Sequence, residues 1–493
     1  MDIFGTALAA GELILAFLSA YTAYNDEAES LRVNFSWDLR VIQDVQDHFE
    51  KVRLQNPDNR LSPRDQDLLE TTTKYLGTLL IKVQKSLSKL HRSGFLHKHI
   101  AQATWIAKRS DLKELAEELR KWTQRFNIRL LGLPPDVGSI IPALNGQSTP
   151  PIITANRRLR QFVQLSFTER EDKAQGLLLE QPQAMIERLK GLPDISARPF
   201  NEGGHQIVFA SRGVPPNEGP GTTAFADRQR DMGHFAAALN CLDDAANIRL
   251  LKVESYFYHP GIMHFLFAQT PPSQTTMMIT LEDFIGLGSF PKVGVSLDQR
   301  FRLAYKLSEA VFFLHTAGFF HKNITSSSVV LFRRKASPEA QSSDLDNAYL
   351  MGFDLIRAAD AKTTKEGAVK EPGSSPRSWE FDIFQHPDRL RGDGSPMYIN
   401  TYDVYSLGVL LLEIGLWEKL SNAAERQVWN DPSTWAKQLS QLAMSSLGPR
   451  TGDRYKSLVK WCLSLDGNKL VSNAEFLQMI LDPLESMANA ISC

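Results

Sequence analysis

The chain begins with an almost unbroken apolar run. Residues 3–24 contain one charged side chain, that of Glu12. As a helix, this stretch would be about 33 Å long, close to the thickness of the hydrocarbon core of a bilayer. However, Glu12 would cost roughly 2.5–3.5 kcal/mol near the centre of a membrane. A secretory signal has basic residues before its apolar run, and none stands there in this sequence. A helix that is apolar on every side can also be buried in a bundle, so we expect burial in the resting protein.

The next hundred residues supply partners for such a helix. Apolar side chains recur every three or four positions over residues 31–52, which predicts an amphipathic helix. Ser62-Pro63 has the form of a helix start, and that helix is expected to run toward Leu90. Another apolar stripe extends from Leu112 to Phe126. Helices joined by short polar turns predict an all-α bundle over residues 1–131.

Composition changes after the bundle. Residues 132–154 are rich in Pro, Gly and Asn, which predicts a linker. Residues 155–195 are predicted to form brace helices, with helical spacing over residues 155–190 that includes Leu177–Leu179. The remainder of the chain, residues 196–493, is predicted to be a mixed α+β domain.

Within that domain, two apolar runs and an intervening helix are predicted. Residues 206–212 and 262–268 are short apolar segments typical of strands. Residues 227–242 have helical spacing, and Pro271-Pro272 is expected to end the second strand. A strand, a helix and a further strand in this order indicate a small lobe built on a sheet.

Composition excludes several classes of protein. The 493 residues carry a formal net charge of −1, and the pI is near 6.8, which argues against a general nucleic-acid binder. The three cysteines are far apart, which argues against a disulfide scaffold or a zinc cluster and suits a reducing compartment. We therefore expect no bound metal and no nucleic-acid partner.

The candidate chemistry lies in two short motifs. Residues 319–332 read FFHKNITSSSVVLF, and residues 349–357 read YLMGFDLIR. The first resembles the catalytic loop of protein kinases, H-R-D-L-x-x-x-N followed by an apolar strand, and the second stands where D-F-G would follow. His321 matches the His of the loop, whereas Asn323 replaces the base Asp.

The resemblance implies that the chemistry is lost. In addition to the base, the metal-holding Asn is replaced by Ser328 and the magnesium-binding Asp by Gly352. Protein kinases orient a hydroxyl with one carboxylate and hold two metal ions with another carboxylate and an amide. We therefore expect no catalytic residue, no cofactor, and no binding of ATP and magnesium. The domain is expected to be a pseudokinase.

Three further motifs resemble the scaffold of the kinase large lobe. Residues 403–414 read DVYSLGVLLLEI, similar to the D-V-W-S-L-G-V helix, whose Asp holds the backbone of the catalytic loop. His386-Pro387-Asp388 stands where A-P-E would end the activation segment. Residues 454–463 are similar to the late helix whose Arg pairs with that Glu. The resemblance thus implies scaffold roles for Asp403, Asp388 and Arg454.

The small lobe matches the family less well. Neither G-x-G-x-x-G nor V-A-I-K occurs, and the helix over residues 227–242 contains Asp231 but no Glu that could pair with a lysine. Arg212 ends the strand that would carry the phosphate-binding Lys, and it is a candidate nucleotide contact or a surface residue. Asp354, two residues after Gly352, is a second candidate contact and would be the metal ligand of an atypical active kinase.

The N-terminal bundle resembles a second family. Phe4-Gly5 leads into an Ala-rich and Gly-rich apolar helix, and residues 105–120 read WIAKRSDLKELAEELR. Both stretches are similar to the fungal HeLo domain, the prion-inhibition and propagation domain of proteins that act in programmed cell death and heterokaryon incompatibility. That resemblance implies that the first helix can leave the bundle and enter a membrane. The residues expected to insert are Phe4, Leu8, Glu12, Leu15 and Leu18.

A run of basic residues supports contact with lipid. No acidic residue occurs between Glu70 and Asp111, whereas basic residues recur there at helical spacing. Such clusters are attracted to the anionic inner leaflet by about 1 kcal/mol for each charge. A solvated helix face is the alternative interpretation. The residues expected to face lipid are Lys82, Lys85, Lys89 and Arg92.

Together, these patterns predict a multi-domain protein in which an N-terminal all-α bundle precedes a bilobal α+β protein-kinase-like domain. The expected function is a signal-controlled cell-death effector, cytoplasmic at rest and recruited to the plasma membrane, where it binds anionic lipids and forms a homo-oligomer. The pseudokinase would control the bundle in response to an upstream signalling protein that the sequence does not identify. Two alternatives remain: an atypical active kinase, and a scaffold that binds partners through the bundle.

Overall fold

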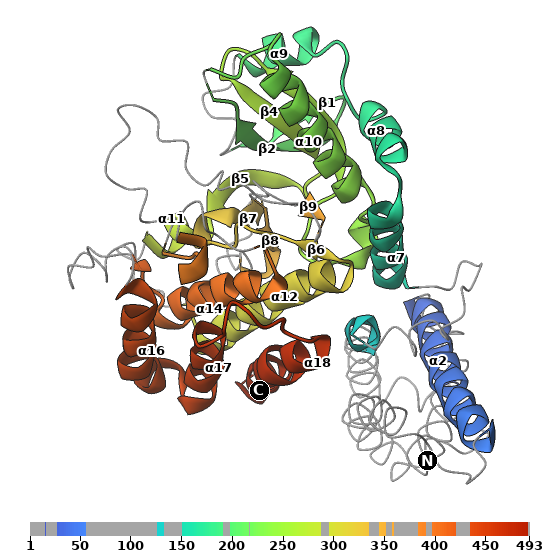
Figure 1. Ribbon diagram of the computed structural model, residues 1–493, viewed down its shortest axis with the longest axis vertical. Helices are drawn as coiled ribbons and strands as arrows, with labels where there is room; N and C mark the ends of the chain where they lie inside the picture. The colour runs from blue at the N-terminus through green and yellow to red at the C-terminus, as the bar shows by residue number, and fades with distance from the viewer. Residues whose placement is uncertain are drawn as a thin grey trace, which may run out of the picture. The chain divides into compact units, whose positions relative to one another are not determined.

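The protein is a mixed α+β chain that divides into two compact units, residues 1–154 and residues 155–493. Figure 1 shows the computed structural model. The structure describes residues 15, 27–55, 126–132, 150–190, 198–215, 217–286, 295–334, 345–351, 357–358, 383–390, 397–420 and 434–491.

In the first unit, the amphipathic helix predicted over residues 31–52 is confirmed as α2, Glu27–Gln55. Phe35 and Leu39 are buried, in agreement with the predicted stripe. Trp37 and Val41 are buried as well, so the buried face is wider than the three-to-four spacing indicated. Residues 126–131 are also helical, and Phe126 at their start is fully buried. The expected helix from Ser62 toward Leu90 lies outside the described residues.

The helix α7, Pro151–Gln164, crosses the boundary between the units. Residues 151–154 are therefore helical, and the prediction of a linker that extends to residue 154 was wrong at its end. Proline at the first helical position fixes φ near the helical value and lacks only an N–H that no intrahelical acceptor needs. Pro151 thus begins a helix, although Pro150-Pro151 has the composition of a linker.

The small sheet of the second unit has four antiparallel strands in the order β1-β2-β4-β3. The strands are β1 Phe200–Glu202, β2 His205–Gly213, β3 Val253–His259 and β4 His264–Gln269. Strands β2 and β4 confirm two of the predicted strands, except that Ile262 and Met263 belong to the turn before β4. Gly203 and Gly204 both have positive φ, which allows the tight turn between β1 and β2.

Alternate residues of β4 face two different helices. Phe265 and Phe267 contact Phe225 and Phe235 of α10, Thr223–Asn240, at ring centroid distances of 5.5 and 4.9 Å. Leu266 and Ala268 point to the opposite face and belong to a core that includes Leu189 of α9. A strand with a period of two can therefore be apolar throughout when helices cover both faces.

The helix α10 begins earlier than the predicted residue 227. The side chain of Thr222 accepts a hydrogen bond from the Phe225 N–H at 3.1 Å and caps the helix. The apolar pattern used for the prediction starts only after this cap, because the first turn of α10 is mostly exposed.

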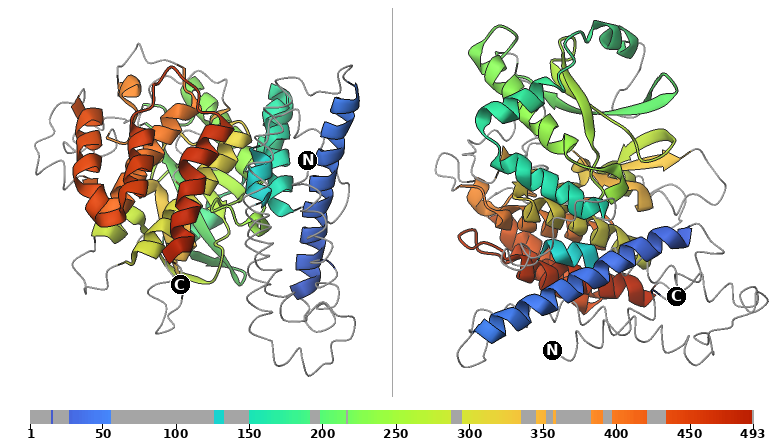
Figure 2. Two further views of the ribbon diagram at one scale, coloured as in Figure 1. Left: turned by 90° about the horizontal axis from the view of Figure 1, so that it is seen from below. Right: turned by 90° about the vertical axis from the view of Figure 1, so that its right-hand side faces the viewer.

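The brace, which we define as residues 155–190, runs along one side of the small sheet and ends beyond it (Figures 1 and 2). Its helices after α7 are α8, Phe167–Gln175, and α9, Gln183–Leu189. The helix α8 lies against α10, where Arg230 donates to Glu171 at 2.9 Å. Gly233 permits this close approach, because a Cβ there would lie 2.9 Å from the Ala174 Cβ and 2.6 Å from the Tyr256 hydroxyl.

Between α8 and α9, the brace extends the sheet instead of continuing as a helix. The Leu179 N–H donates to the Tyr256 carbonyl at 2.9 Å, and the Tyr256 N–H donates to the Leu177 carbonyl at 3.0 Å. The prediction of helix through Leu177–Leu179 was therefore wrong. Gly176 follows α8, and the apolar residues after it satisfy the open edge of β3.

The helical part of the second unit is organised around α14, Asn400–Leu416, in which every residue from Thr401 onward is buried. Neighbouring helices pack against it on several sides (Figure 1), so its sequence is apolar all round. The helices of this part are α11 Leu281–Gly286, α12 Leu297–Thr316, α16 Trp435–Thr451, α17 Asp453–Leu463, α18 Asn473–Phe476, the π-helical turn η8 Leu477–Leu481 and α19 Asp482–Ile491.

Short antiparallel strands lie between the small sheet and these helices. One sheet has the order β5-β7-β8, and the other pairs β6 with β9. Strand β5, which follows Pro271-Pro272 closely, has no counterpart among the predicted strands. The strands are β5 Thr275–Thr280, β6 Phe319–Phe320, β7 Val329–Arg334, β8 Ala348–Leu350 and β9 Arg357–Ala358. The remaining short 3-10 turns are η1 Asp244–Ala246, η2 Ser326–Ser328, η4 Leu345–Asn347 and η5 Pro387–Leu390.

Candidate functional site

The loop between β6 and β7 contains the motif residues, and it is almost completely buried. His321, Lys322 and Asn323 are exposed by 4% or less. Lys322 has a φ of +65°, an uncommon value for a residue with a side chain. The strained backbone at Lys322 lets two consecutive N–H groups point toward the same side chain.

That side chain is Asp403, in the first turn of α14. Its Oδ2 accepts hydrogen bonds from the His321 N–H at 2.7 Å and from the His315 Nε2 at 3.1 Å. Its Oδ1 accepts from the Lys322 N–H at 2.8 Å and from the Tyr398 hydroxyl at 2.7 Å. Each carboxylate oxygen thus has two donors, and Asp403 itself has no exposed surface. The resemblance implies that Asp403 holds this loop, and Asp403 accepts hydrogen bonds from two of the loop's backbone N–H groups.

The electrostatics of the cluster follow from this pairing. Burial by itself would raise the pKa of Asp403, but the hydrogen bonds from His315 and Tyr398 outweigh it and hold the pKa below its usual value. Burial lowers the pKa of His321 to about 4, although the charge of Asp403 opposes this change. Burial, with the nearby Asp403, also raises the pKa of Tyr398 well above its usual value. At neutral pH, the cluster therefore contains a carboxylate, a neutral His321 and a neutral phenol.

Two cationic side chains lie close to the aromatic ring of Tyr398. The Lys322 Nζ lies 5.0 Å from the centroid of Tyr398, and the Arg389 guanidinium lies 5.3 Å from it. Tyr398 also stacks edge-on against Tyr402 at 5.2 Å. These contacts use the long side chains of the loop and of η5 for packing around Asp403.

Ser328 is occupied by its own loop. Its hydroxyl accepts from the Thr325 N–H at 3.0 Å and donates to the Thr325 carbonyl at 2.8 Å. The Thr325 hydroxyl in turn accepts from the Ser328 N–H at 3.1 Å, which completes a reciprocal cap on η2. The side chain in the place of the metal-holding Asn thus stabilises a turn.

An apolar cluster fills the region between β2, β5, β7 and β8. It consists of six buried side chains, those of Val208, Leu251, Met278, Phe332, Tyr349 and Met351, with Ala210 and Val330 packed against them. Phe332 meets Tyr349 edge-on at 5.5 Å, and the Arg249 guanidinium lies 5.4 Å from the Tyr349 ring. Arg212 lies farther along β2, opposite Phe265 of β4, and is half-buried.

Asp388 and Arg454 are not paired with each other in the structure. The Arg454 guanidinium donates to the Ser486 hydroxyl at 2.8 Å, and no ion pair joins it to Asp388. The Asp388 carboxylate instead lies 3.5 Å from the His386 ring, and its N–H donates to that ring at 3.2 Å. The pairing that the resemblance implied is therefore corrected. The shorter Asp in place of Glu is held by His386 at the turn of η5.

Several predicted site residues lie outside the described residues. They are Phe4, Leu8, Glu12, Leu18, Lys82, Lys85, Lys89, Arg92, Gly352 and Asp354. Leu15 is helical and half-buried. None of the described helices is both long enough and apolar enough to cross a membrane. Over the same residues, no group of three or more His, Cys, Asp or Glu side chains could hold a metal ion.

Sequence reasoning missed three members of the buried polar network. Two of them are His315 and Tyr398, which donate to Asp403. The third, Glu413, lies in the last turn of α14 and is 2% exposed. Burial raises the pKa of Glu413 to about 7, against hydrogen bonds from Ser326 and from the Leu420 N–H. A lone Glu in an apolar helix was the available signal.

No protein-family model matches this chain, and no curated protein matches it significantly. The functional argument therefore rests on the loop around Asp403, on the apolar cluster and on the motifs in the sequence.

Proposed function

We propose that residues 196–493 form a protein-kinase-like domain that does not transfer phosphate and that controls the N-terminal unit. The order of elements supports this proposal. The helix α10 lies in the chain between β2 and β3 of the small antiparallel sheet. The helical part built on α14 comes after this sheet in the chain. The loop from His321 to Ser328 follows α12 of the helical part and is held by α14 through Asp403.

The observation that carries the proposal is how the loop side chains are used. A phosphotransferase needs a carboxylate near the accepting hydroxyl and oxygen ligands for magnesium. At these positions the loop has the amide of Asn323, which cannot take a proton at neutral pH, and the hydroxyl of Ser328, which caps η2. The loop has thus kept the interactions that fix its shape, whereas its chemical groups have been replaced.

The apolar cluster is consistent with independence from nucleotide. Ala210 and Val330 approach it from β2 and β7, and the buried rings of Phe332 and Tyr349 occupy the space around them. A planar base that entered this cluster would have to displace these side chains. We therefore propose that the domain acts through its shape and its contacts, without bound ATP and magnesium.

Incubation of the full chain with radiolabelled ATP and either magnesium or manganese tests the first part. We expect no incorporation into the chain or into a general protein substrate. Incorporation that the substitution Asp354→Ala abolishes would show the atypical active kinase instead. Incorporation that persists unchanged in Asp354→Ala would indicate a copurifying kinase and would be removed by further purification.

The proposed effector is the N-terminal bundle, acting on anionic membrane lipids as a homo-oligomer after release. One structural feature favours control by the second unit. The helix α7 begins in the first unit and is anchored in the second, where the Asn156 amide donates to the Phe313 carbonyl at 3.1 Å and the Arg160 Nε donates to the Thr316 carbonyl at 2.7 Å. These bonds satisfy carbonyl groups at the end of α12, next to His315 of the Asp403 network.

Dye leakage from vesicles with anionic lipid tests this control in the full chain. Arg160→Ala should weaken the anchor of α7 and increase leakage, whereas Arg158→Ala, an exposed position on the same helix, should leave leakage unchanged. Adding Leu15→Lys and Leu18→Lys to the Arg160→Ala chain should abolish leakage if the first helix inserts. Circular dichroism must show that each variant is still folded.

Absence of leakage from every variant would favour the scaffold alternative. Equal leakage from the Arg160→Ala and Arg158→Ala chains would show that the anchor of α7 has no controlling role. In either case the activity assay remains informative, because it tests the domain and not the bundle.

A further inference from the structure

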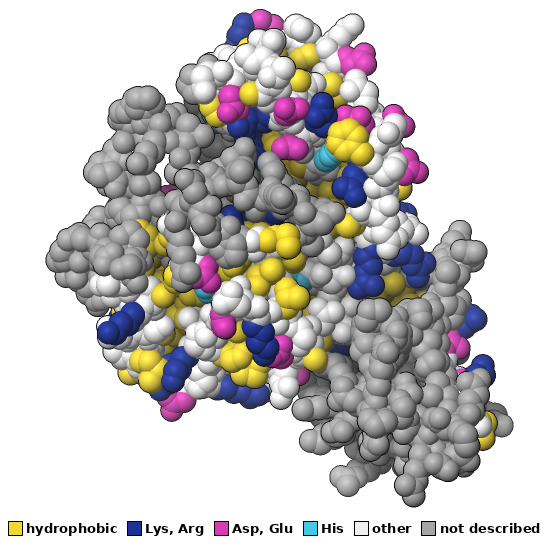
Figure 3. Space-filling view, in the orientation of Figure 1, with side chains coloured by type: hydrophobic (Ala, Val, Ile, Leu, Met, Phe, Trp, Pro, Cys, Tyr) yellow, Lys and Arg dark blue, Asp and Glu magenta, His cyan; other side chains and the backbone are white. Residues whose placement is uncertain are grey.

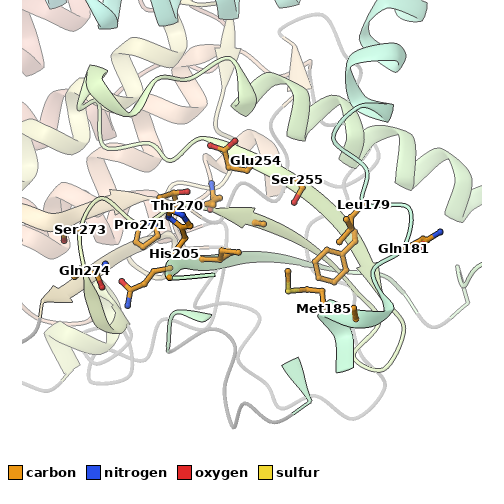
Figure 4. A pocket seen from close by; sticks show the side chains of 17 residues that line it. Leu179, Gln181, Met185, His205, Glu254, Ser255, Thr270, Pro271, Ser273 and Gln274 are labelled. Atoms are coloured by element: carbon orange, nitrogen blue, oxygen red, sulfur yellow. The ribbon is translucent and has the colours of Figure 1, made fainter. Parts of the chain in front are cut away.

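A concave site lies on the other side of the small sheet from the apolar cluster. Its volume is about 670 Å³, within the usual range for small-molecule sites. In Figure 4, the brace residues Leu179, Gln181 and Met185 line one side, and Pro271, Ser273 and Gln274 line the opposite side. The pocket is therefore formed where the brace passes over the sheet. We call it the brace pocket.

The floor of the brace pocket is apolar and continuous with a core. Phe257 and Ala268 are buried in the cluster that contains Leu189, and Ile207 packs against the same cluster from β2. Leu179, Met185 and Ile207 are only partly buried, so apolar surface stays open to the pocket. A ligand that covered these three side chains would gain roughly 25 cal/mol for each Å² of apolar surface removed from water.

Polar side chains in the pocket are almost all neutral. Hydroxyl and amide groups come from Ser255, Thr270, Ser273 and Gln274, among others. No Lys or Arg is among the described lining residues. The one carboxylate in the lining, that of Glu254, is paired with Lys252 at 3.1 Å. Apart from the ring of His205, this lining offers hydrogen bonds to neutral groups and no counter-charge for a phosphate or a carboxylate.

One of the polar residues fixes the geometry of the rim. The Gln206 amide donates to the Thr275 carbonyl at 2.9 Å and accepts from the Thr275 N–H at 2.7 Å. This pair ties β2 to residues 270–275, which connect β4 to β5. The rim is thus held at the connection between the small sheet and the rest of the unit, while the brace supplies the opposite wall.

We propose that the brace pocket binds a neutral, largely apolar small molecule that carries hydroxyl or amide groups. It is separate from the apolar cluster, because Ile207 and Phe209 face the pocket side of β2, whereas Val208 and Ala210 face the cluster. A molecule bound there contacts both the brace and the sheet and therefore stabilises their association. The inference does not rest on the proposed function, since it uses only the lining of the pocket.

Two fluorescent probes with one ring system test the charge argument on the full chain. N-phenyl-1-naphthylamine is neutral and carries one N–H, and 8-anilinonaphthalene-1-sulfonate adds a sulfonate to the same rings. We expect saturable binding of the neutral probe at one site, and binding of the sulfonate at least tenfold weaker. Equal affinity for both probes would overturn the assignment of a neutral ligand.

Substitutions on both walls test the location. Ala184 and Thr270 line the pocket and are exposed, so Ala184→Trp and Thr270→Trp should fill it without disturbing a core. Each should weaken binding of the neutral probe at least tenfold. Ala226→Trp makes the same change at an exposed position of α10 outside the pocket and should leave affinity unchanged. Unchanged affinity in both filled variants, with circular dichroism equal to that of the parent, would overturn the proposal.

Discussion

The two ends of α14 each contain a buried carboxyl group, and the pKa values of the two groups are shifted in opposite directions. Asp403 lies in the first turn and Glu413 in the last, and neither is exposed by more than 2%. The pKa of Asp403 is held below its usual value, whereas the pKa of Glu413 is raised to about 7. At neutral pH the carboxyl group at the start of the helix is therefore charged, whereas the one at the end is close to its pKa.

The number of donors accounts for most of the difference. Four hydrogen bonds converge on Asp403, two on each oxygen. Glu413 accepts from the Leu420 N–H at 2.9 Å and interacts with Ser326, but its Oε2 has no hydrogen-bond partner among the described residues. Glu282 adds a repulsive charge, and Lys419 only partly offsets it. Burial then favours the protonated form of Glu413.

The position along the helix acts in the same direction. The N-terminal end of a helix has a partial positive charge that favours an anion, and the C-terminal end has a partial negative charge that disfavours one. Asp403 benefits from this field, and Glu413 is opposed by it. The comparison indicates that burial alone does not decide the state of a carboxyl group. The donors and the helix end around it decide whether it stabilises the fold as a charge.

The largest effect is expected from Asp403→Asn. The amide would direct an NH₂ group toward donors that now point at a carboxylate, and the negative charge that pairs with them would be lost. We expect the free energy of unfolding to fall by about 3–5 kcal/mol, as for other broken buried charge networks. Urea unfolding followed by circular dichroism measures it.

The control for this substitution is Asp453→Asn. Asp453 also lies in the first turn of a helix and accepts a hydrogen bond from a side chain, that of Lys456, but its own side chain is 85% exposed. The loss of stability there should be small, because solvent screens the pair. A loss in Asp403→Asn as small as that of the control would mean that the network around Asp403 does not hold the loop.

The middle of α14 depends on close packing. A Cβ at Gly408 would lie 2.4 Å from the Cβ of Cys462 in α17. Gly408→Ala should therefore lower the free energy of unfolding by about 3 kcal/mol, the upper part of the range for overpacked cores. Gly448→Ala on α16 is the control, because its new Cβ would meet only the ends of the Asp453 and Lys456 side chains, at 3.4 Å.

A double variant separates the clash from other causes. In a Cys462→Gly chain the opposing Cβ is gone, so adding Gly408→Ala should lower stability by clearly less than in the parent. An equal loss in both backgrounds would contradict the view that this contact fixes the position of α14.

Parts of this network could be predicted from the sequence, and parts could not. Asp403 was identifiable because a run of motif residues surrounds it on one helix. Its partner His315 was not, since it lies 88 residues away in the chain, and Tyr398, only five residues away, stands in no regular apolar pattern. Asp388 and Arg454 were identifiable as positions, but their pairing depends on side-chain reach, and the shorter Asp at residue 388 is held by His386 instead.

The elements show the same limit. Strand β2 follows from a short apolar run, and helix α2 follows from its three-to-four apolar spacing. Leu177–Leu179 have a helical neighbourhood in the sequence, yet they satisfy the edge of β3. Pro151 begins α7 although its composition indicates a linker. In the first case backbone hydrogen bonding decided the structure, and in the second the fixed φ angle of proline did. The pattern of apolar side chains indicates neither.

Glu413 should make stability depend on pH. Its folded-state pKa of about 7 is above the ordinary value of 4.5, so the folded protein binds the proton more tightly than the unfolded chain. The stability contribution of the protonated form is complete below pH 4.5 and is lost as the pH rises through 7. We expect Glu413→Gln to gain roughly 2–3 kcal/mol of stability relative to the parent between pH 5 and pH 8.

The difference between the two chains must be compared at each pH, because His321 acts in the opposite direction. Its folded-state pKa of about 4 means that stability is lost as the pH falls from 6.5 toward 4 in both chains. Glu187→Gln, at a surface residue paired with Lys190, should show no such pH-dependent difference. A constant difference between Glu413→Gln and the parent from pH 5 to pH 8 would show that Glu413 is not protonated in the folded protein.

The smallest effect concerns a single hydroxyl at each of two buried tyrosines. Tyr398 donates to the charged Asp403 at 2.7 Å, and Tyr455 donates to the neutral Leu411 carbonyl at 2.7 Å. Hydrogen bonds to charged groups contribute roughly 1.5–3 kcal/mol, whereas those between neutral groups contribute about 1 kcal/mol. Tyr398→Phe keeps the ring that Lys322 and Arg389 contact, so it should lose about 2 kcal/mol, and Tyr455→Phe about 1 kcal/mol. In an Asp403→Asn background the two substitutions should become equal, since the charge that distinguishes them is gone. If Tyr398→Phe still loses more than Tyr455→Phe in that background, the difference between them comes from packing and not from the carboxylate at the start of α14.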